Sequence, residues 1–381
     1  MDCPNISMIR GVLKGRVRYR AKLAHPAWVG LKNLRRCASS QNPGKILIGE
    51  DTLAKPKLFR KDHLIDSHDE GVKLHLREKK PRGMKKSEAA GTLLMVHGQS
   101  TPAPVAFDLP LPGYSWMDFA ASRGFHVYAL CIRGYGPSTR PPEMLRSPAG
   151  HPPAVRGITA VRDIDAAVRF ICGQNAIGKL NLLGWSWGTT TTAAFTAGKQ
   201  SRVRRLALYA PFYAYDNPQA AALWEDPARP GRWDPRKGAW RWVTEAYQRE
   251  RWDGSIPRGQ HAKWRTEAAI KRFWSEQQKF DPEGAKRKTP AVRVPNGAMA
   301  DSYDRARNKP LYDAGRITCP VLTIRGDHDR SSTDPVFAAV YRALVNSRGK
   351  RSITLGDATH FAQYEWCREA LFSEVQNFIE G

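Results

Sequence analysis

Short apolar runs alternate with amphipathic segments along much of this 381-residue chain, and this alternation limits what the chain can fold into. The runs at 92–96 ("TLLMV"), 180–183 ("LNLL") and 203–209 ("VRRLALY") have the length and composition of buried strands. Between them, residues 161–171 place apolar side chains at the spacing of one helix face. Buried strands that alternate with helices indicate a parallel sheet covered on both faces. We therefore predict an α/β fold with a mostly parallel, doubly wound sheet.

The alternation of strand-like and helix-like segments stops in the second half of the chain and then resumes. Residues 212–312 contain helix-like pieces, seven of the twelve tryptophans and no apolar strand. We interpret this segment as a helical cap inserted between two halves of one core, 57–211 and 313–381. Residues 1–56 are basic and lack periodicity, which favours a disordered N-terminal extension; a transit peptide or a start codon placed too far upstream are the alternatives.

The formal net charge of +25 raises the question of a nucleic-acid partner. Residues 1–60 alone hold 13 Lys and Arg against 3 Asp and Glu, and no zinc-finger, helix-turn-helix or RNA-binding motif accompanies the excess. We therefore expect no specific nucleic-acid binding. No run of eighteen apolar residues occurs, so no membrane span is predicted. Six scattered cysteines are typical of a reducing compartment, which favours the cytoplasm, with targeting through the basic N-terminal segment as the alternative.

The pentapeptide "GWSWG" at 184–188 follows an apolar strand and precedes a helix. It fits G-x-S-x-G, in which a very tight strand-to-helix turn exposes a serine. Small residues two positions to either side let neighbouring segments approach the turn. The turn places Ser186 at a helix N-terminus, where free N–H groups favour developing negative charge. Ser186 is therefore the candidate nucleophile, with a capping serine as the structural alternative.

A serine hydroxyl needs a base, and the base needs an orienting acid. His360, in a loop between the last strand and the last helix, is the best candidate for the base. For the acid, Asp329 is favoured over Asp327 because it lies further into the loop after its strand; Asp357 is a distant third. The other histidines downstream of Ser186 are His261 and His328.

Negative charge that develops on a carbonyl oxygen requires N–H donors. The backbone N–H of Trp187 is one candidate, and Gln99, in the loop after "LLMVHG", is the other. His97 fits a structural role better than a catalytic one. Tryptophans are candidates for lining an acyl pocket, although the core of a small cap also needs them. The candidates are Trp185, Trp224, Trp240 and Trp242.

These motifs taken together resemble the α/β-hydrolase superfamily, and the likeness runs from about residue 58 to the C-terminus. The matching stretches are "VHG", "RGYGPS", "GWSWG", "RGDHD" and "DATHF". The resemblance implies Ser186 as nucleophile, Asp329 as acid, His360 as base and a helical cap. Two stretches depart from it. Cys131 stands where similar enzymes usually have an aspartate, and the histidine–glycine turn continues as Gln99-Ser100-Thr101 without further glycines.

We therefore predict a serine hydrolase that cleaves a small-molecule carboxylic ester through an acyl-enzyme, without a metal or organic cofactor. A peptidase or amidase similar to proline iminopeptidases, a lactonase and an acyltransferase are alternatives on the same machinery. A non-catalytic binding protein with this fold is the alternative from another class. The sequence carries no signal for the oligomeric state or for the particular ester.

Overall fold

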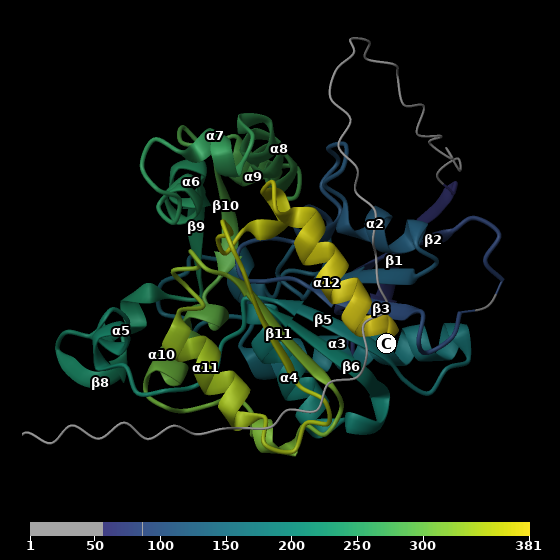
Figure 1. Cartoon of the computed structure of the whole chain (residues 1–381). Helices are drawn as coiled ribbons and strands as arrows, with labels where there is room; N and C mark the ends of the chain where they lie inside the picture. Colours follow the sequence, from purple (N-terminus) through teal and green to yellow (C-terminus); the bar gives the residue numbers. More distant parts are fainter. Residues whose placement is uncertain (1–55, 86) are drawn as a thin grey trace, which may run out of the picture. The chain divides into compact units, whose positions relative to one another are not determined.

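The computed structural model describes residues 56–85 and 87–381 (Figure 1). Residues 1–55 of the predicted N-terminal extension lie outside the described residues. Eight strands form one sheet in the order β1-β2-β4-β3-β5-β6-β11-β12. Strand β1 pairs antiparallel with β2, and β2 pairs antiparallel with β4. The other neighbours are parallel, which confirms the predicted fold class. The strands are β1 Leu58–Asp66, β2 Lys73–Pro81, β3 Thr92–Val96, β4 His126–Leu130, β5 Leu180–Trp185, β6 Val203–Tyr209, β11 Val321–Gly326 and β12 Arg351–Leu355.

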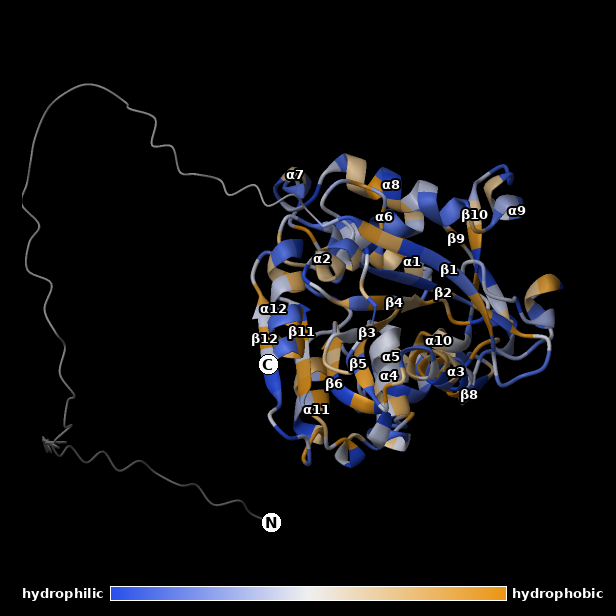
Figure 2. Cartoon of the chain, turned by 90° about the vertical axis from the view of Figure 1, so that its right-hand side faces the viewer, coloured by the Kyte–Doolittle hydropathy of each residue, from blue (hydrophilic) through white to orange (hydrophobic). Residues whose placement is uncertain are grey.

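Helices cover both faces of this sheet because the side chains of a strand alternate between its faces. In β3, Leu94 and Val96 join a core with α3, α4 and α11, whereas Leu93 and Met95 join a core with α1, α2 and α12. Figure 2 shows hydrophobic residues on the inner strands and a more hydrophilic β1 at the edge. Across the described ranges, no helix is both long and apolar enough to cross a bilayer. The helices are α1 Ala103–Phe107, α2 Trp116–Ser122, α3 Gly157–Asn175, α4 Trp187–Gly198, α11 Asp334–Ala343 and α12 Arg368–Glu380.

The segment between β6 and β11 contains strands as well as helices, which corrects the expectation of a strand-free insertion. Strand β9 pairs antiparallel with β10, and β7 pairs antiparallel with β8. Both "WRWVT" and "AVRVP" carry an arginine among their apolar residues, so neither gives a continuous apolar run. The elements are α5 Pro218–Ala222, β7 Glu225–Asp226, β8 Arg229–Trp233, β9 Trp240–Thr244, α6 Glu245–Asp253, α7 His261–Trp264, α8 Glu267–Gln278, α9 Pro282–Ala285, β10 Ala291–Pro295 and α10 Gly297–Ala306.

Candidate active site

Ser186 is the single residue between β5 and α4. Its backbone has φ 56° and ψ −122°, a conformation that residues with a side chain rarely adopt. The two flanking glycines are required by close approach. A Cβ on Gly184 would lie 2.4 Å from the carbonyl oxygen of Gly188, and one on Gly188 would lie 2.3 Å from that of Val96. The packing of the turn therefore demands the G-x-S-x-G pattern.

A continuous chain of hydrogen bonds joins the three residues that the sequence singled out. The Oγ of Ser186 lies 2.8 Å from Nε2 of His360. On the other side of the ring, Nδ1 of His360 lies 2.8 Å from Oδ2 and 3.0 Å from Oδ1 of Asp329. All three side chains are buried. An imidazole held in this way can accept a proton from the hydroxyl while the carboxylate fixes its tautomer.

Asp329 is the carboxylate that contacts His360, whereas Asp327 has another partner set. Besides His360, Asp329 accepts hydrogen bonds from the N–H groups of Ser331 and Ser332, each at 2.8 Å. Burial raises the pKa of Asp329, but His360 and these N–H groups outweigh it and hold the pKa below its usual value. Asp327 instead accepts from the N–H of Ala358 at 3.1 Å and shapes the loop before His360.

The loop that carries His360 is fixed through its backbone and by a carboxylate that sequence reasoning missed. The carbonyl oxygen of His360 accepts from Nε1 of Trp185 at 3.1 Å and from the hydroxyl of Tyr209 at 3.0 Å. Glu365, which is fully buried, accepts from the N–H of Thr359 at 2.9 Å. Burial raises the pKa of Glu365 to about 7, against the effect of its hydrogen bonds. No motif marks this glutamate, because its role depends on the fold of the loop.

The loop after β3 lies directly against the Ser186 turn. A Cβ on Gly98 would lie 2.8 Å from the Cβ of Ser186 and 3.3 Å from its Oγ, so the backbone of the Gly98–Gln99 segment borders the nucleophile. As the first residue of α4, Trp187 has a backbone N–H without an intrahelical acceptor. His97 is fully buried, and burial lowers its pKa to about 4. Its neutral ring bridges the carbonyl of Gly98 at 2.7 Å and the N–H of Ile132 at 3.1 Å, a structural role.

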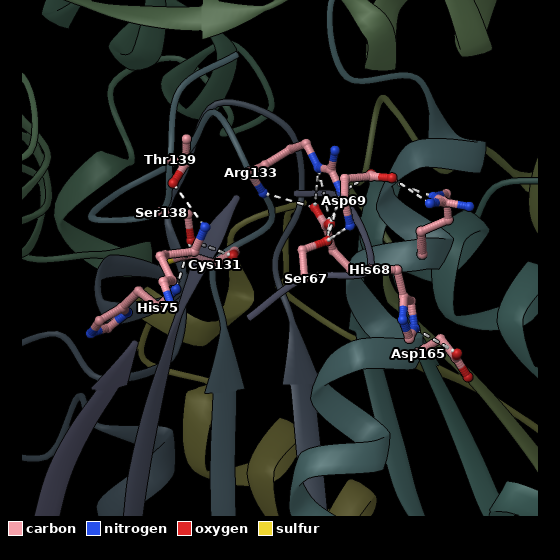
Figure 3. Close-up of polar contacts among 12 residues, drawn as sticks. Ser67, His68, Asp69, His75, Cys131, Arg133, Ser138, Thr139 and Asp165 are labelled. Carbon is pink, nitrogen blue, oxygen red and sulfur yellow. Dashed lines mark hydrogen bonds and ion pairs between the residues drawn. The ribbon is translucent and has the colours of Figure 1, made fainter. Parts of the chain in front are cut away.

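The "RGYG" segment after β4 is anchored by ion pairs (Figure 3). Arg133 is buried, and its Nε lies 3.0 Å from Oδ1 of Asp163, which is fully buried on α3. Its Nη2 also reaches Oγ of Ser67 at 2.8 Å and Oδ2 of Asp69 at 2.6 Å. Each charged group in this cluster therefore has a partner.

Cys131, which stands where the resemblance implied an aspartate, is a buried thiol. Burial raises its pKa to about 12, so it stays protonated. A Cβ on Gly136 would lie 2.8 Å from its Sγ, so the loop folds closely over it. The loop is also held by Ser138, whose Oγ donates to the Cys131 carbonyl at 2.7 Å and accepts from the N–H of His75 at 2.8 Å (Figure 3).

A cavity of about 250 Å³ opens beside the elbow, with Trp187 and Phe212 in its wall. The ring of Phe212 lies 6.1 Å from that of His360, centroid to centroid, so the cavity adjoins the reactive group. The indole Nε1 of Trp187 donates to Oδ2 of Asp301 at 2.9 Å. The described wall consists of Arg156, Trp187, Thr190, Phe212, Tyr213, Ala214, Asp301, Asp304, Arg305, Lys309, Pro310, Leu311 and Tyr312.

The four tryptophans predicted as pocket candidates pack elsewhere, and none belongs to the described wall of this cavity. Trp185 is buried against Tyr209, with the ring centroids 6.3 Å apart. Trp224, between α5 and β7, stacks on Trp233 of β8. Trp240 and Trp242 pack edge to face at 5.0 Å on β9. Within the described ranges, no cluster of three or more His, Cys, Asp or Glu side chains has the arrangement of a metal site.

Comparison with known proteins identifies the fold. The family model described as "alpha/beta hydrolase fold" matches residues 91–365. A thermophilic esterase from Thermogutta terrifontis (malate bound) has a TM-score of 0.52 and 16% identity, covering 84% of this chain and 98% of that one. An E-2-(acetamidomethylene)succinate hydrolase has a TM-score of 0.54 and 20% identity over 85% and 100% of the two chains. An epoxide hydrolase from Vigna radiata has 0.54 and 14% over 85% and 98%. A search of the curated proteins finds no match.

Proposed function

Because the chain belongs to the α/β-hydrolase family, we propose that it is a serine hydrolase that cleaves carboxylic esters through an acyl-enzyme. The single observation that carries the proposal is the chain of hydrogen bonds Ser186 Oγ–His360 Nε2 and His360 Nδ1–Asp329. In this assignment Ser186 is the nucleophile, His360 the general base and acid, and Asp329 the orienting acid. The lowered pKa of Asp329 supports that role, because the carboxylate stays charged beside the imidazole.

In the first half-reaction, Nε2 of His360 takes the hydroxyl proton as Oγ of Ser186 attacks the carbonyl carbon of the ester. The tetrahedral oxyanion binds the backbone N–H groups of Trp187 and Gln99, donors that are worth about 10²- to 10³-fold in rate each. The intermediate then collapses. His360 gives its proton to the alkoxide, and the alcohol leaves while the acyl group stays on Ser186.

In the second half-reaction, water repeats the attack. His360 accepts a proton from the water as its oxygen attacks the acyl carbon, and the second oxyanion binds the same two N–H groups. When the bond to Ser186 breaks, His360 returns the proton to Oγ and the carboxylic acid leaves. Cleavage of an amide or a lactone would begin with the same attack by Ser186, and an acyltransferase would use an alcohol in place of water in the second half-reaction. Substrate panels must therefore test these alternatives.

We further propose that residues 212–312 act as a cap that governs access to Ser186. Aromatic packing between this segment and the His360 loop supports this assignment. The rings of Trp252 and Phe361 stack with centroids 5.3 Å apart, and those of Phe273 and Tyr364 meet at 5.1 Å. Because Phe361 directly follows His360, this packing joins residues 212–312 to the loop that holds the base.

The proposal is tested by labelling with a fluorophosphonate probe, which reacts with activated serines. We expect one labelled site, Ser186, and no labelling of Ser186→Ala. Ser275→Ala is the matched control, because Ser275 is exposed on α8 and should leave labelling unchanged. A series of p-nitrophenyl esters, run beside lactone and proline-amide substrates, then identifies the bond that is cleaved.

Three results would contradict the proposal. Equal labelling of wild type and Ser186→Ala would exclude Ser186 as the nucleophile. Folded wild-type protein that neither reacts with the probe nor turns over any substrate would favour a non-catalytic binding protein. Turnover of the proline amide alone would replace the esterase assignment with a peptidase.

A further inference from the structure

Arg305, on α10, is a cation without a partner in the wall of the cavity beside Trp187. Its guanidinium carbon lies 4.1 Å from the centroid of the Phe212 ring. Burial lowers the pKa of Arg305 to about 10, so the side chain remains charged at neutral pH. Among the described residues, no carboxylate forms an ion pair with it. A partly buried charge without a counterion costs free energy, and such a group requires an explanation.

The two carboxylates of the same wall are already engaged by other groups. Oδ1 of Asp301 accepts a hydrogen bond from Nε of Arg156 at 2.6 Å. Its Oδ2 accepts one from Nε1 of Trp187 at 2.9 Å and one from the N–H of Gly157 at 2.7 Å. Asp304 pairs with Nη2 of the same Arg156. Both acids of the wall therefore contact Arg156, and neither forms an ion pair with Arg305. With Lys309, the wall holds three cationic side chains against two carboxylates.

Two buried hydroxyl groups in this wall also have no hydrogen-bond partner among the described residues. They are Oγ1 of Thr190 and the phenolic OH of Tyr312. Buried polar atoms are nearly always hydrogen-bonded in folded proteins, so unpaired ones indicate a place for water or a ligand. Guanidinium and hydroxyl groups are donors that bind the oxygens of a carboxylate or phosphate group.

Two more arginines of residues 212–312 also lack a carboxylate partner among the described residues. Arg241 donates only to neutral groups, including Oδ1 of Asn296 at 2.9 Å and Oγ of Ser100 at 3.3 Å. The guanidinium carbon of Arg251 lies 5.7 Å from the ring of Phe361, and the described residues give it no acidic partner within ion-pair distance. Other arginines of the segment do have carboxylate partners: Arg249, Arg265 and Arg293.

We propose that the natural substrate is an ester whose acyl group ends in an anion, such as a carboxylate, and that Arg305 binds this anion in the cavity. The inference rests on the proposed acyl-enzyme function. An acyl group stays attached to Ser186 after the alcohol leaves, so its binding site must adjoin Ser186, as this cavity does through Trp187. Arg305 is thus a specificity-determining residue, and Arg241 and Arg251 add positive potential around the same site.

The test compares two esters that differ in one charge, p-nitrophenyl hydrogen glutarate and p-nitrophenyl pentanoate. We expect wild-type kcat/KM to favour the half-ester by about 10- to 100-fold, the range of one charge-assisted hydrogen-bonded contact. In Arg305→Gln this ratio should fall close to one, and in Arg305→Lys it should be intermediate, because lysine keeps the charge but loses the planar fork. Arg342→Gln, an exposed arginine on α11, is the matched control and should keep the wild-type ratio.

Further measurements on wild type keep the inference testable if Arg305→Gln does not fold. Raising the salt concentration from about 0.05 M to about 0.5 M should slow the half-ester more than the neutral ester. Glutarate should protect Ser186 from the fluorophosphonate more strongly than inorganic phosphate does; the reverse order would identify a phosphate-bearing acyl group. A wild-type enzyme that labels at Ser186 yet prefers the neutral ester would overturn this inference and leave the proposed function standing. Absence of labelling would instead overturn the function.

Discussion

Arg133, in the loop after β4, and Arg305, in the cavity beside α4, place the same side chain in opposite circumstances. Arg133 is surrounded by Asp163, Asp69 and Ser67, and its charge is neutralised within the core. Arg305 packs on an aromatic ring with no carboxylate partner among the described residues. A charge that the fold itself neutralises holds a loop in place. A charge that the fold leaves open is available to a ligand.

The largest expected effect distinguishes Asp329, which contacts His360, from Asp327, which does not. Asp329→Asn should lower kcat by about 10³- to 10⁴-fold, because the imidazole of His360 loses the carboxylate that fixes its tautomer. Asp327→Asn is the matched control and should keep most of the activity, since Asp327 contacts backbone N–H groups of the loop rather than His360. Steady-state kinetics on one p-nitrophenyl ester decides between them. Equal losses in both variants would remove Asp329 from its assigned role.

The second prediction sets the two arginines against each other in stability. Arg133→Gln should lower the free energy of unfolding by about 3–5 kcal/mol, because it leaves the buried carboxylate of Asp163 without its partner. Arg305→Gln should change it by less than about 1 kcal/mol, or raise it, because a charge without a counterion is removed. Urea unfolding at neutral pH measures both values. A large loss in Arg305→Gln would mean that Arg305 holds the fold, as Arg133 does.

The third prediction concerns Glu365 and pH. Its pKa is raised to about 7 in the folded state, so the protonated form is favoured by folding. This contribution is fully present below the ordinary glutamate pKa and is lost as the pH rises through about 7. It amounts to at most about 3 kcal/mol. Glu365→Gln should therefore flatten the decline of stability between pH 5 and pH 8, measured by urea unfolding, whereas Glu369→Gln on the exposed side of α12 should not. Identical slopes in wild type and Glu365→Gln would contradict the assignment.

The smallest expected effect concerns Trp224, which lies between α5 and β7 and is not part of the described cavity wall. Trp224→Phe should cost about 1 kcal/mol of stability, because it weakens the stacking on Trp233. The preference among ester chain lengths should not change, since Trp224 is absent from the described wall of the cavity. A shifted chain-length profile would indicate that Trp224 lines the acyl pocket, as the sequence predicted.

Local patterns in the sequence were sufficient for the sheet and the turn. The run "TLLMV" predicted β3, and the glycines of "GWSWG" predicted a turn that only small flanking residues permit. His360 and Asp329 were also identified as candidates, because each follows a core strand and a chemical need restricted the choice. Strands β9 and β10 were missed, since they pair with each other and interrupt their apolar residues with arginine.

The sequence by itself determined the class of fold, the strained serine and the residue types available to activate it, because these depend on neighbours a few positions apart. It left Asp327 and Asp329 as alternatives, and the folded loop then brought Asp329 to His360. The sequence also does not indicate which of the many basic side chains lack a carboxylate partner. Whether an arginine is neutralised depends on where distant carboxylates come to lie: α3 brings Asp163 to Arg133, whereas Arg156 occupies the acids beside Arg305. Only the tertiary structure decides such pairings, because electrostatic contact follows distance in space and not separation along the chain.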